Sequence, residues 1–394
     1  MLAVSGIGWF VTSYNPQTIL SVLVVATPCS LIFATPVAIM SGINRAAKVG
    51  IIIKSGQSIE QIGKAQVVVF DKTGTITFGT PAVEEIITFD RDSPSRSTNN
   101  HINTDDILLK AASVEQLSSH PAAQALVQKA QERNLGNLSI PANFHEVSGV
   151  GVEGEINGEH IDVGSHSFFE KMENESDSDY NEYMKKALDA NKSLIHYDEG
   201  KMLALISINE KPAGVILFGD HIRPGITSMI QRLRNLGVRQ TVMLTGDNFE
   251  NAQKIAQQIG ITYFESDLLP EQKVVSVNRL KETYKNIVMV GDGINDAPAL
   301  AAATVGIAMG ARGTALSAEA ADMVLLIDDV TRVADALEIG QRTLSIAKQS
   351  IYIGLSASFI FMIIASLGFI PPTIGALLQE VFDVAVILNA LRAR

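Results

Sequence analysis

The chain has 394 residues, enough for two or three domains at roughly 100–200 residues each, and its formal charge at pH 7 is −11. The acidic balance argues against a nucleic-acid partner, and the single cysteine, Cys29, excludes an internal disulfide. Hydrophobic residues make up 46% of the sequence, and two long runs, 1–44 and 349–379, contain no charged residue. A helix that crosses a membrane needs about 20 mostly apolar residues, so both runs are long enough.

The two apolar runs predict transmembrane helices near both ends of the chain. Residues 1–11 look like the last part of a spanning helix, and 17–40 is long enough for a full span. We assign 1–63 to the first membrane region and 333–394 to the last two spans. Basic residues near the spans predict a multi-pass protein of a cell membrane, in contact with lipid, whose polar domains are cytoplasmic. These basic residues are Arg45, Lys48, Lys54, Arg342, Lys348, Arg392 and Arg394.

The polar middle of the chain alternates strands with helices. Residues 67–70 form a short apolar run of the kind found in a buried parallel strand. Further strands are expected at 215–218, 241–244, 287–290 and 305–308. This alternation predicts a doubly wound α/β domain built from 64–83 and 213–332.

A second soluble domain, 84–212, is expected to be inserted into the first. The polar loop at 91–106 is predicted to be mobile because it is rich in Ser, Asn and Asp. Residues 105–135 have a helical pattern, and 145–166 alternate short strands with glycine turns. The acidic segment 170–186 is expected to face solvent. These elements predict an α+β insert.

Asp71 opens the motif Asp-Lys-Thr-Gly-Thr directly after the strand expected at 67–70. Ligands of open α/β sheets bind beyond the carboxyl ends of the strands, so this carboxylate is aimed into a site. There it can attack a phosphoryl group and form an aspartyl phosphate. Gly74 lets the backbone approach a phosphate, and Thr73 can offer its carbonyl oxygen to a metal ion.

Two further motifs and a lysine extend this site. Asp292 follows a strand and is expected to share a Mg²⁺ ion with Asp71, and Asn295 can complete the ion's ligands. The motif at 245–247 offers a hydroxyl to a phosphate oxygen, and Lys273 supplies a positive charge. A lone Asp after a strand is usually a cap or turn residue, but three such motifs together indicate a site. The expected catalytic residues are Asp71, Lys72, Thr73, Thr245, Gly246, Asp247 and Lys273, and the expected Mg²⁺ ligands are Asp71, Thr73, Asp292 and Asp296.

These motifs resemble those of the P-type ATPase phosphorylation domain, a Rossmann-like domain of the haloacid-dehalogenase-like superfamily. The resemblance covers essentially the whole chain. It implies that Asp71 is the phosphorylated residue, Asp292 the principal Mg²⁺ ligand and Lys273 a phosphate contact. Residues 220–224 match the family's hinge back into the phosphorylation domain. The implied reaction is ATP hydrolysis that drives cation transport, with Mg²⁺ as cofactor.

The insert is similar to the nucleotide-binding domain of the heavy-metal branch of that family. Glu115, followed by His120 and Pro121, resembles the branch's adenine-recognition motif, in which the imidazole can stack on the base or hydrogen-bond to it. Residues 149–154 resemble its glycine-rich loop, although such a run alone equally predicts a hairpin turn. The sequence departs from the family at 164–165, where Gly-Ser replaces the usual Gly-Asn. The residues expected to bind ATP are Glu115, His120, Pro121, Gly149, Gly151 and Gly154.

A Thr-Pro-Cys sequence, residues 27–29, lies near the middle of the first full span. Proline frees a backbone carbonyl and cysteine offers a thiolate, and ion sites are commonly built where a helix is broken at mid-membrane. In this family the position matches the metal motif. A kinked helix with an inert buried cysteine is the alternative.

The last span carries Gln379 and Asp383 on one helix face, and Glu380 can join them. Acids inside a membrane are functional by default, although an interfacial position is the alternative. Ser358 and Met362 also share a face, for which packing is the better interpretation.

One thiolate with carboxylates and an amide suits a borderline divalent ion, because copper(I) prefers paired soft ligands. The pairing of Thr-Pro-Cys with Gln-Glu-x-x-Asp resembles a small subgroup associated with nickel, iron or cobalt, whereas zinc and cadmium pumps usually carry Cys-Pro-Cys. We therefore expect a divalent transition metal as cargo. Its expected ligands are Thr27, Cys29, Gln379, Glu380 and Asp383.

The family's actuator motif, Thr-Gly-Glu, does not occur in the sequence. We therefore expect either a carboxy-terminal fragment of a pump or a truncated gene product. In both cases the chain is expected to bind ATP and phosphorylate Asp71 but to need the amino-terminal part, which a separate chain could supply, for transport. One alternative is a phosphohydrolase of the same superfamily, against which the span at 17–40 and the insert argue. Another is a non-transporting regulatory subunit that binds nucleotide or metal, against which the retained Asp71, Lys273 and Asp292 argue.

Overall fold

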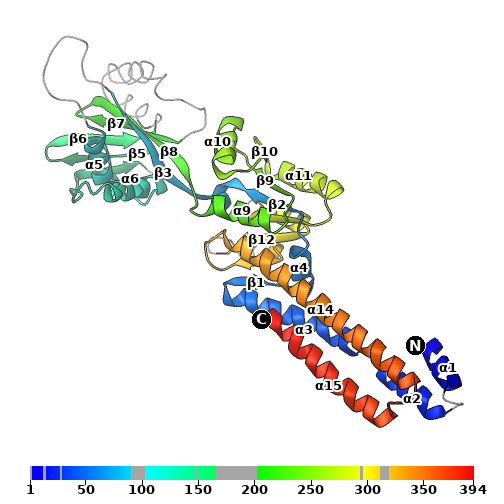
Figure 1. Cartoon of the computed structure of the whole chain (residues 1–394). Coiled ribbons are helices and arrows are strands. Elements are labelled where there is room, and N and C mark those ends of the chain that lie inside the picture. The colour runs from blue at the N-terminus through cyan, green and yellow to red at the C-terminus, as the bar shows by residue number, and fades with distance from the viewer. Residues whose placement is uncertain are drawn as a thin grey trace. The chain divides into compact units, whose positions relative to one another are not determined.

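The computed structural model describes residues 2–11, 15–26, 29–89, 103–147, 150–165, 168, 202–292, 296–310 and 319–394. The chain divides into two compact units: the first is Met1–Ile76 with Ile222–Arg394, and the second is Thr77–His221 (Figure 1). The second unit is thus an insert, with limits somewhat wider than the 84 and 212 expected from the sequence. The acidic segment 170–186 and most of the loop at 91–106 lie outside the described residues.

A sheet of seven described strands forms the centre of the first unit. In spatial order the strands are β1 (Ile51–Ile53), β13 (Met323–Leu325), β12 (Val305–Met309), β11 (Ile287–Gly291), β2 (Val67–Asp71), β9 (Gln240–Leu244) and β10 (Tyr263–Glu265). Neighbouring strands run parallel, except that β1 is antiparallel to β13. Since β2 lies between β11 and β9, the carboxyl ends of these three strands meet at one edge of the sheet.

Helices cover both faces of this sheet. Phe70 of β2 packs in one apolar cluster with Ile230 and Leu337, whereas Val69 packs on the other face with Val277. The first face is covered by α4 (Gly56–Ile62), α9 (Ile226–Asn235), α10 (Phe249–Ile259) and the start of α14 (Arg332–Ser366), and the second by α11 (Pro270–Thr283) and α12 (Ala297–Ala302). The predicted doubly wound α/β architecture is therefore confirmed.

The second unit is an α+β domain, as predicted. Its six described strands, in spatial order, are β3 (Thr77–Thr88), β8 (Lys211–Ile222), β7 (Leu203–Ile208), β6 (Glu159–Gly164), β5 (Gly151–Ile156) and β4 (Ala142–Val147). Helices α5 (Thr104–Glu115) and α6 (Pro121–Glu132) pack on one face, where Leu108 and Leu126 share a cluster with Ile161. The turn between β5 and β6 has positive φ at Asn157 and Gly158, typical of a tight hairpin.

One strand prediction was wrong. Residues 215–218 were assigned to the doubly wound sheet but lie in the middle of β8, where Val215 pairs with Leu205 of the antiparallel β7. This run is buried on both faces, since Ile216 packs against the helices and Val215 belongs to a cluster on the opposite face. A doubly buried antiparallel strand has the same continuous apolar pattern as a parallel one, so the sequence alone did not separate the two cases.

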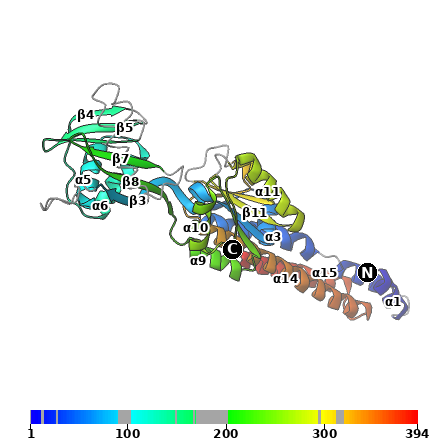
Figure 2. The same ribbon diagram turned by 90° about the horizontal axis from the view of Figure 1, so that it is seen from above.

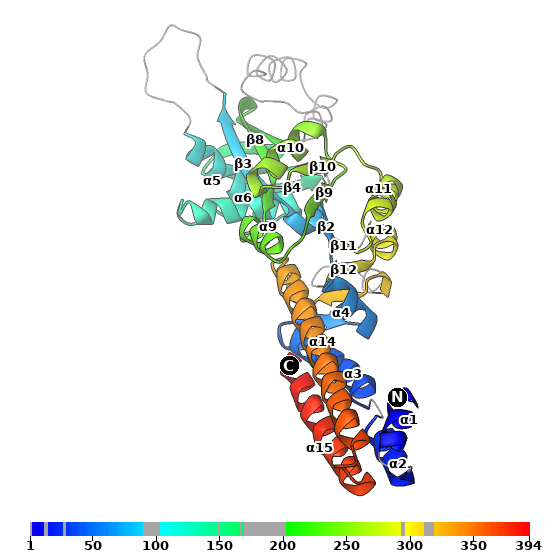
Figure 3. The same ribbon diagram turned by 45° about the vertical axis from the view of Figure 1, so that its right-hand side comes forward.

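Apolar helices of the first unit pack together as a bundle (Figures 2 and 3). They are α1 (Leu2–Val11), α2 (Pro16–Val25), α3 (Cys29–Lys48), α14, and α15 (Pro372–Ala390) with a short continuation, η2 (Leu391–Ala393). Among the described residues, two helical segments are long and apolar enough to cross a membrane, Arg332–Ser366 and Pro372–Ala393. The span expected at 17–40 is divided between α2 and α3, and Thr27 and Pro28 lie outside the described residues.

Helix α14 belongs to both parts of the first unit. Its 35 residues span about 50 Å at 1.5 Å per residue. Leu337, near its start, packs in the core beneath the sheet, whereas Ala365, near its end, packs with Val22 of α2. Figure 3 shows the helix running from the sheet into the bundle.

Candidate active site

Asp71 is the last residue of β2, and only 4% of its surface is exposed. In the sheet, Asp71 pairs with Leu244 of β9, and the preceding Phe70 pairs with Val290 of β11. The motifs that follow these two neighbouring strands begin at Thr245 and Gly291, so the tertiary structure brings the three predicted motifs to the same edge of the sheet.

Lys273 bridges two carboxylates at this edge. Its Nζ donates hydrogen bonds to Oδ1 of Asp71 at 2.6 Å and to Oδ1 of Asp296 at 2.8 Å. Lys273 projects from α11, Asp296 directly precedes α12, and all three side chains are buried. A buried ammonium shared by two carboxylates places a fixed positive charge beside the candidate nucleophile.

The backbone after Asp71 makes a tight turn at Thr73 and Gly74. Their φ/ψ angles are −75°/128° and 74°/−11°, close to the two central residues of a type II turn. A Cβ added at Gly74 would lie 2.6 Å from Oδ2 of Asp292. Glycine is thus required here both by the positive φ and by the closeness of the Asp292 carboxylate.

Electrostatics set Asp71 apart from an ordinary carboxylate. Burial raises its pKa to about 7, repulsion from Asp296 and Asp292 adds to the rise, and Lys273 opposes it. Burial lowers the pKa of Lys273, but its attraction to Asp71 and Asp296 outweighs burial and raises that pKa overall. Three carboxylates around one ammonium leave an excess of negative charge, and their oxygen donors fit a hard divalent cation such as Mg²⁺.

The motif at 245–247 is linked to the motif after β2. Lys72 forms a salt bridge with Asp247, and its side chain is 6% exposed. Thr245 is buried, and its hydroxyl oxygen accepts a hydrogen bond from the backbone N of Asp247 at 3.1 Å. Gly246 lies between them and faces the carbonyl of Leu268. Asn295 lies outside the described residues.

Arg223 supports the turn and was considered in the sequence only as part of the hinge at 220–224. Its Nη2 donates to the carbonyl oxygen of Gly74 at 3.0 Å, and its Nη1 donates to the carbonyl of Asp328 at 3.1 Å and contacts that residue's carboxylate at 2.7 Å. The side chain is 3% exposed. Its partners lie 149 and 105 residues away along the chain, so no local pattern could reveal this role.

Replacement of Gly74 by Ala is expected to lower the rate of phosphorylation from ATP by about 10²-fold, because a Cβ would displace Asp292 by a fraction of an ångström or more. The positive φ adds about 1–2 kcal/mol of strain. Gly237→Ala is the matched control, since Gly237 has φ of 89° but nothing within 4 Å of an added Cβ. Equal phosphorylation rates in the two variants would contradict the role assigned to the space beside Asp292.

In the second unit, the predicted adenine motif lies at the junction of α5 and α6. Glu115 ends α5 and is buried, whereas His120 is exposed and caps α6, its Nδ1 accepting a hydrogen bond from the backbone N of Ala122 at 3.2 Å. A neutral His120 must therefore carry its proton on Nε2, which leaves a hydrogen-bond donor on an exposed ring. Pro121, the first residue of α6, fixes the start of that helix.

Burial raises the pKa of Glu115 to about 7, and repulsion from Glu146 adds to the rise. The folded state therefore keeps a proton on Glu115 that the unfolded state releases near pH 4.5. The contribution of this proton to the free energy of unfolding is lost as pH rises through about 7. We expect Glu115→Gln to reduce the loss of thermal stability between about pH 5 and pH 8. Thermal unfolding of both proteins across this range tests the expectation, with the exposed Glu132→Gln as control; parallel curves for wild type and Glu115→Gln would refute it.

The expected glycine-rich loop is a strand in the described part of the chain. Gly151 begins β5 and Gly154 lies within it, and Gly149 lies outside the described residues. A Cβ at Gly151 would lie 2.7 Å from the ring of Phe168, and one at Gly154 would lie 3.0 Å from Pro141. These glycines therefore allow close packing on both faces of the sheet. The sequence pattern alone does not distinguish glycines that allow such packing from glycines of a phosphate-binding loop.

Two residues of the predicted ion site meet on one helix of the bundle. In α15, Gln379 Nε2 donates to Oδ1 of Asp383 at 3.1 Å, and both side chains are buried. Glu380 is exposed in the described structure, although a spacing of three residues keeps it next to Asp383 on the helix surface. That Glu380 joins this pair stays a prediction. The side chain of Cys29 lies outside the described residues.

Ser358 and Met362 lie on α14. Ser358 is 5% exposed, and its hydroxyl has no hydrogen-bond partner among the described residues. Met362 packs against the apolar cluster that contains Val22 and Ala365, as the packing interpretation predicts.

Residues 65–304 match the haloacid dehalogenase-like hydrolases. A probable cadmium-transporting ATPase of Alkalihalophilus pseudofirmus is 36% identical over 95% of this chain and 49% of its own length. A manganese-exporting P-type ATPase of Mycobacterium bovis is 34% identical over 99% of this chain and 51% of its own length. The chain thus spans about half the length of these curated relatives.

The structural comparison agrees. The crystal structure of a zinc-transporting PIB-type ATPase, in a phosphorylated state, superposes with a TM-score of 0.80 at 33% identity, over 99% of this chain and 62% of that one. Asp71 and its neighbouring motifs lie within the matched residues 65–304. The chain belongs to the haloacid dehalogenase-like hydrolase family and, within it, is a homologue of the metal-transporting P-type ATPases.

Proposed function

We propose that this protein is the catalytic and ion-binding part of a P-type ATPase, which transports a divalent heavy-metal cation across a membrane by way of a phosphorylated Asp71. The observation that carries the proposal is the buried carboxylate of Asp71 at the end of β2, held by Lys273 beside Asp292 and Asp296. Its place at the carboxyl edge of a doubly wound sheet supports a role in phosphoryl transfer.

The chemical step follows from this geometry. An ionised oxygen of Asp71 attacks the γ-phosphorus of ATP, a new O–P bond forms, and the bond from that phosphorus to the bridging oxygen of ADP breaks. Lys273 offsets negative charge on Asp71 and the incoming phosphoryl group, and the hydroxyl of Thr245 can donate to a phosphoryl oxygen. Asp71, the Thr73 carbonyl, Asp292 and Asp296 would hold Mg²⁺, which when bound neutralises phosphate charge and favours the ionised form of Asp71.

We assign ATP binding to the second unit. The exposed ring of His120 offers an aromatic face and an Nε2–H donor, and the neighbouring Glu115 can donate or accept a proton near neutral pH, where its pKa lies. Both are groups that recognise a purine ring. These residues are proposed to hold the adenine while Asp71 receives the phosphoryl group.

We assign the transported cation to the bundle of the first unit. Val25 of α2 lies against Gly375 of α15, and Ala38 of α3 shares a cluster with Ala390. We propose on this basis that the start of α3 at Cys29 lies at about the level of Gln379 and Asp383 along α15. A thiolate, an amide and a carboxylate at one depth would make a site for a borderline divalent ion. The relatives named above carry cadmium, manganese or zinc in their descriptions, and our proposal for this chain is nickel, iron or cobalt.

The proposed topology is a multi-pass protein of the cell membrane. Helix α14 and the segment Pro372–Ala393 are proposed to cross the membrane with the bundle around them. The seven-stranded sheet with its covering helices and the second unit are proposed to lie in the cytoplasm.

The experiment that tests the proposal measures ATP hydrolysis by the chain co-expressed with an amino-terminal part of a homologous pump, against a panel of metals. Nickel, iron or cobalt is expected to stimulate hydrolysis. Stimulation by copper(I) alone would overturn the metal assignment, and no stimulation by any metal would overturn transport.

Asp383→Asn is expected to abolish the metal stimulation, because it removes the buried carboxylate from the bundle. Glu380→Gln is the companion variant: it removes the adjacent, exposed negative charge of the same helix. Retained stimulation in Glu380→Gln would exclude Glu380 as a ligand, and retained stimulation in Asp383→Asn would overturn the proposed site.

A further inference from the structure

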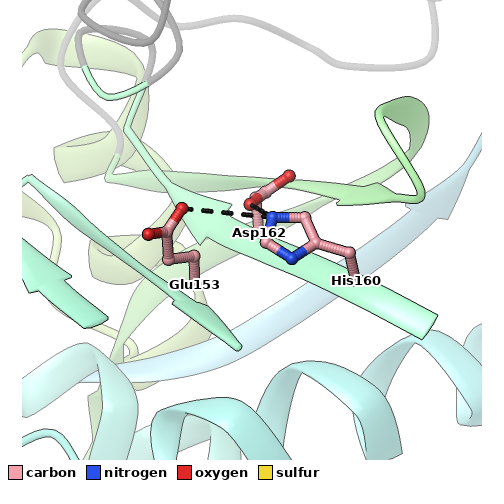
Figure 4. Close-up of side chains that lie close together, drawn as sticks. All are labelled: Glu153, His160 and Asp162. Carbon is pink, nitrogen blue, oxygen red and sulfur yellow. Dashed lines mark ion pairs between the residues drawn. The ribbon is translucent and has the colours of Figure 1, made fainter. Parts of the chain in front are cut away.

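A second cluster of possible metal ligands lies in the second unit, within its sheet. Glu153 of β5 and His160 and Asp162 of β6 point toward one another on one side of the hairpin (Figure 4). One ligand atom from each of the three residues lies within 4.8 Å of the others. Neither the phosphoryl-transfer site nor the ion site of the bundle uses these residues.

The strand register explains why they meet. Glu153 pairs directly with Asp162, which in turn pairs with Ser207 of β7, so these side chains lie on one face of the sheet. His160, two residues before Asp162 on the same strand, shares that face. His145 of β4 pairs with Glu153 in the same row, which places a second exposed imidazole on the next strand.

The distances suit a first-row metal. His160 Nε2 lies 3.0 Å from Oδ1 of Asp162 and 4.0 Å from Oε2 of Glu153. Zinc bonds to nitrogen and oxygen of about 2.0–2.2 Å place tetrahedral ligand atoms roughly 3.3–3.6 Å apart, so small side-chain movements would close this set around an ion.

The second observation that points to a ligand is the state of Asp162. Its side chain is 3% exposed; Oδ2 accepts a hydrogen bond from Ser207, whereas Oδ1 faces the cluster, lies 3.0 Å from Nε2 of His160 and has no other hydrogen-bond partner among the described residues. A carboxylate oxygen buried in this way is stabilised either by a proton on His160 Nε2 or by a cation bound between the two side chains. The hydroxyl of Ser207 orients the carboxylate in the way that outer groups orient metal ligands.

We propose that Glu153, His160 and Asp162, with His145 in reach, form a binding site for a divalent transition-metal cation such as Zn²⁺, Co²⁺ or Ni²⁺. An imidazole with two carboxylates suits these ions, whereas Mg²⁺ prefers oxygen ligands alone. The ordinary alternative is an ion pair between protonated His160 and the carboxylates, which needs no metal. Because Glu153 lies between Gly151 and Gly154, an ion here would join β5, which carries those glycines, to β6.

The test is a titration of the metal-free full chain with Co²⁺, without ATP or Mg²⁺. The proposed site is expected to give the weak visible bands of cobalt bound to nitrogen and oxygen. Cobalt on Cys29 would instead add a thiolate charge-transfer band in the near ultraviolet, so the two sites are distinguishable. Zn²⁺ is expected to displace the visible signal.

His160→Gln is expected to lower the affinity for Co²⁺, measured from the visible bands, by at least about tenfold. Glu159→Gln is the matched control, because Glu159 is adjacent in β6 but pairs with Lys110 on the other face, and it should titrate like wild type. Asp162→Asn tests the buried oxygen. Should that variant not fold, Glu153→Gln, whose carboxylate is partly exposed, decides the same question. Wild-type cobalt affinity in both His160→Gln and Glu153→Gln would overturn the site.

Discussion

Replacement of Asp71 by Asn is expected to abolish acid-stable phosphorylation from ATP, with a loss of about 10⁴-fold or more, the scale on which removal of a covalent nucleophile acts. The amide keeps the shape of the side chain and an acceptor for Lys273 but lacks an ionisable oxygen to attack phosphorus. The measurement is transfer of labelled γ-phosphate from ATP to the full chain, quenched in acid. Asp267→Asn is the control, because Asp267 is exposed and its φ of 56° suits Asn equally.

The same substitution separates catalysis from folding. Burial raises the pKa of Asp71 to about 7, so the folded state binds a proton that the unfolded state releases near pH 3.8. The stability associated with that proton is lost as pH rises through about 7, and above it an ionised Asp71 destabilises the metal-free protein. Asp71→Asn should therefore raise the thermal midpoint, by more at about pH 8 than at about pH 5. If Asp71→Asn were both unphosphorylated and less stable than wild type, misfolding would explain the loss of phosphorylation. That result would contradict the predicted gain in stability.

Replacement of Lys273 by Met is expected to have the second largest effect. Without the ammonium, the buried carboxylates of Asp71 and Asp296 lose their shared partner, and breaking such an interaction costs about 3–5 kcal/mol when the remaining charge stays buried. Loss of the ammonium also raises the pKa of Asp71 further, because Lys273 is the group that lowers it. Proton uptake by Asp71 then relieves part of this cost and leaves less of the nucleophilic form at neutral pH. Both the thermal midpoint and the phosphorylation rate should fall, and residual phosphorylation should shift to higher pH.

Two variants make this prediction specific. Lys281→Met changes the same residue type on the same helix, where the ammonium is exposed and donates to the carbonyl of Ala302, and should be close to wild type. Adding Asp296→Asn to Lys273→Met removes one of the stranded charges and should restore part of the stability but not the phosphorylation. Phosphorylation of Lys273→Met at the wild-type rate would show that the lysine is structural only.

Much of the candidate site could be predicted from the sequence, because the signals are local. Asp71 is the last residue of a fully buried strand, and the motifs at 245–247 and at Asp292 follow their own strands directly. Parallel strands of a doubly wound sheet present their carboxyl ends at one edge, so the meeting of these motifs follows from chain order and strand type. Lys273 was expected to supply a positive charge to this site, its contact with a phosphate was implied by the family resemblance, and α11 places it beside Asp71.

The error in the fold arises where two structures share one sequence pattern. A strand buried on both faces looks the same whether its neighbours are parallel or antiparallel, so 215–218 was placed in the wrong sheet. The structure places Gly151 and Gly154 in a closely packed strand, and their contact with ATP stays a prediction. The role of Glu380 beside Asp383 also stays a prediction, because it rests on helix spacing.

The sequence by itself determined the fold class, the identity of the candidate nucleophile and the apolar helices, because strand periodicity, polar motifs at strand ends and long uncharged runs are properties of neighbouring residues. The tertiary structure decided which charges share a buried space: Lys273 with Asp71 and Asp296, Arg223 with the turn at Gly74, and His160 with Glu153 and Asp162. Except within the β5–β6 hairpin, these groups are far apart along the chain. The pKa of a carboxylate depends on burial and on charges within a few ångströms, and strand pairing and helix packing alone set those distances.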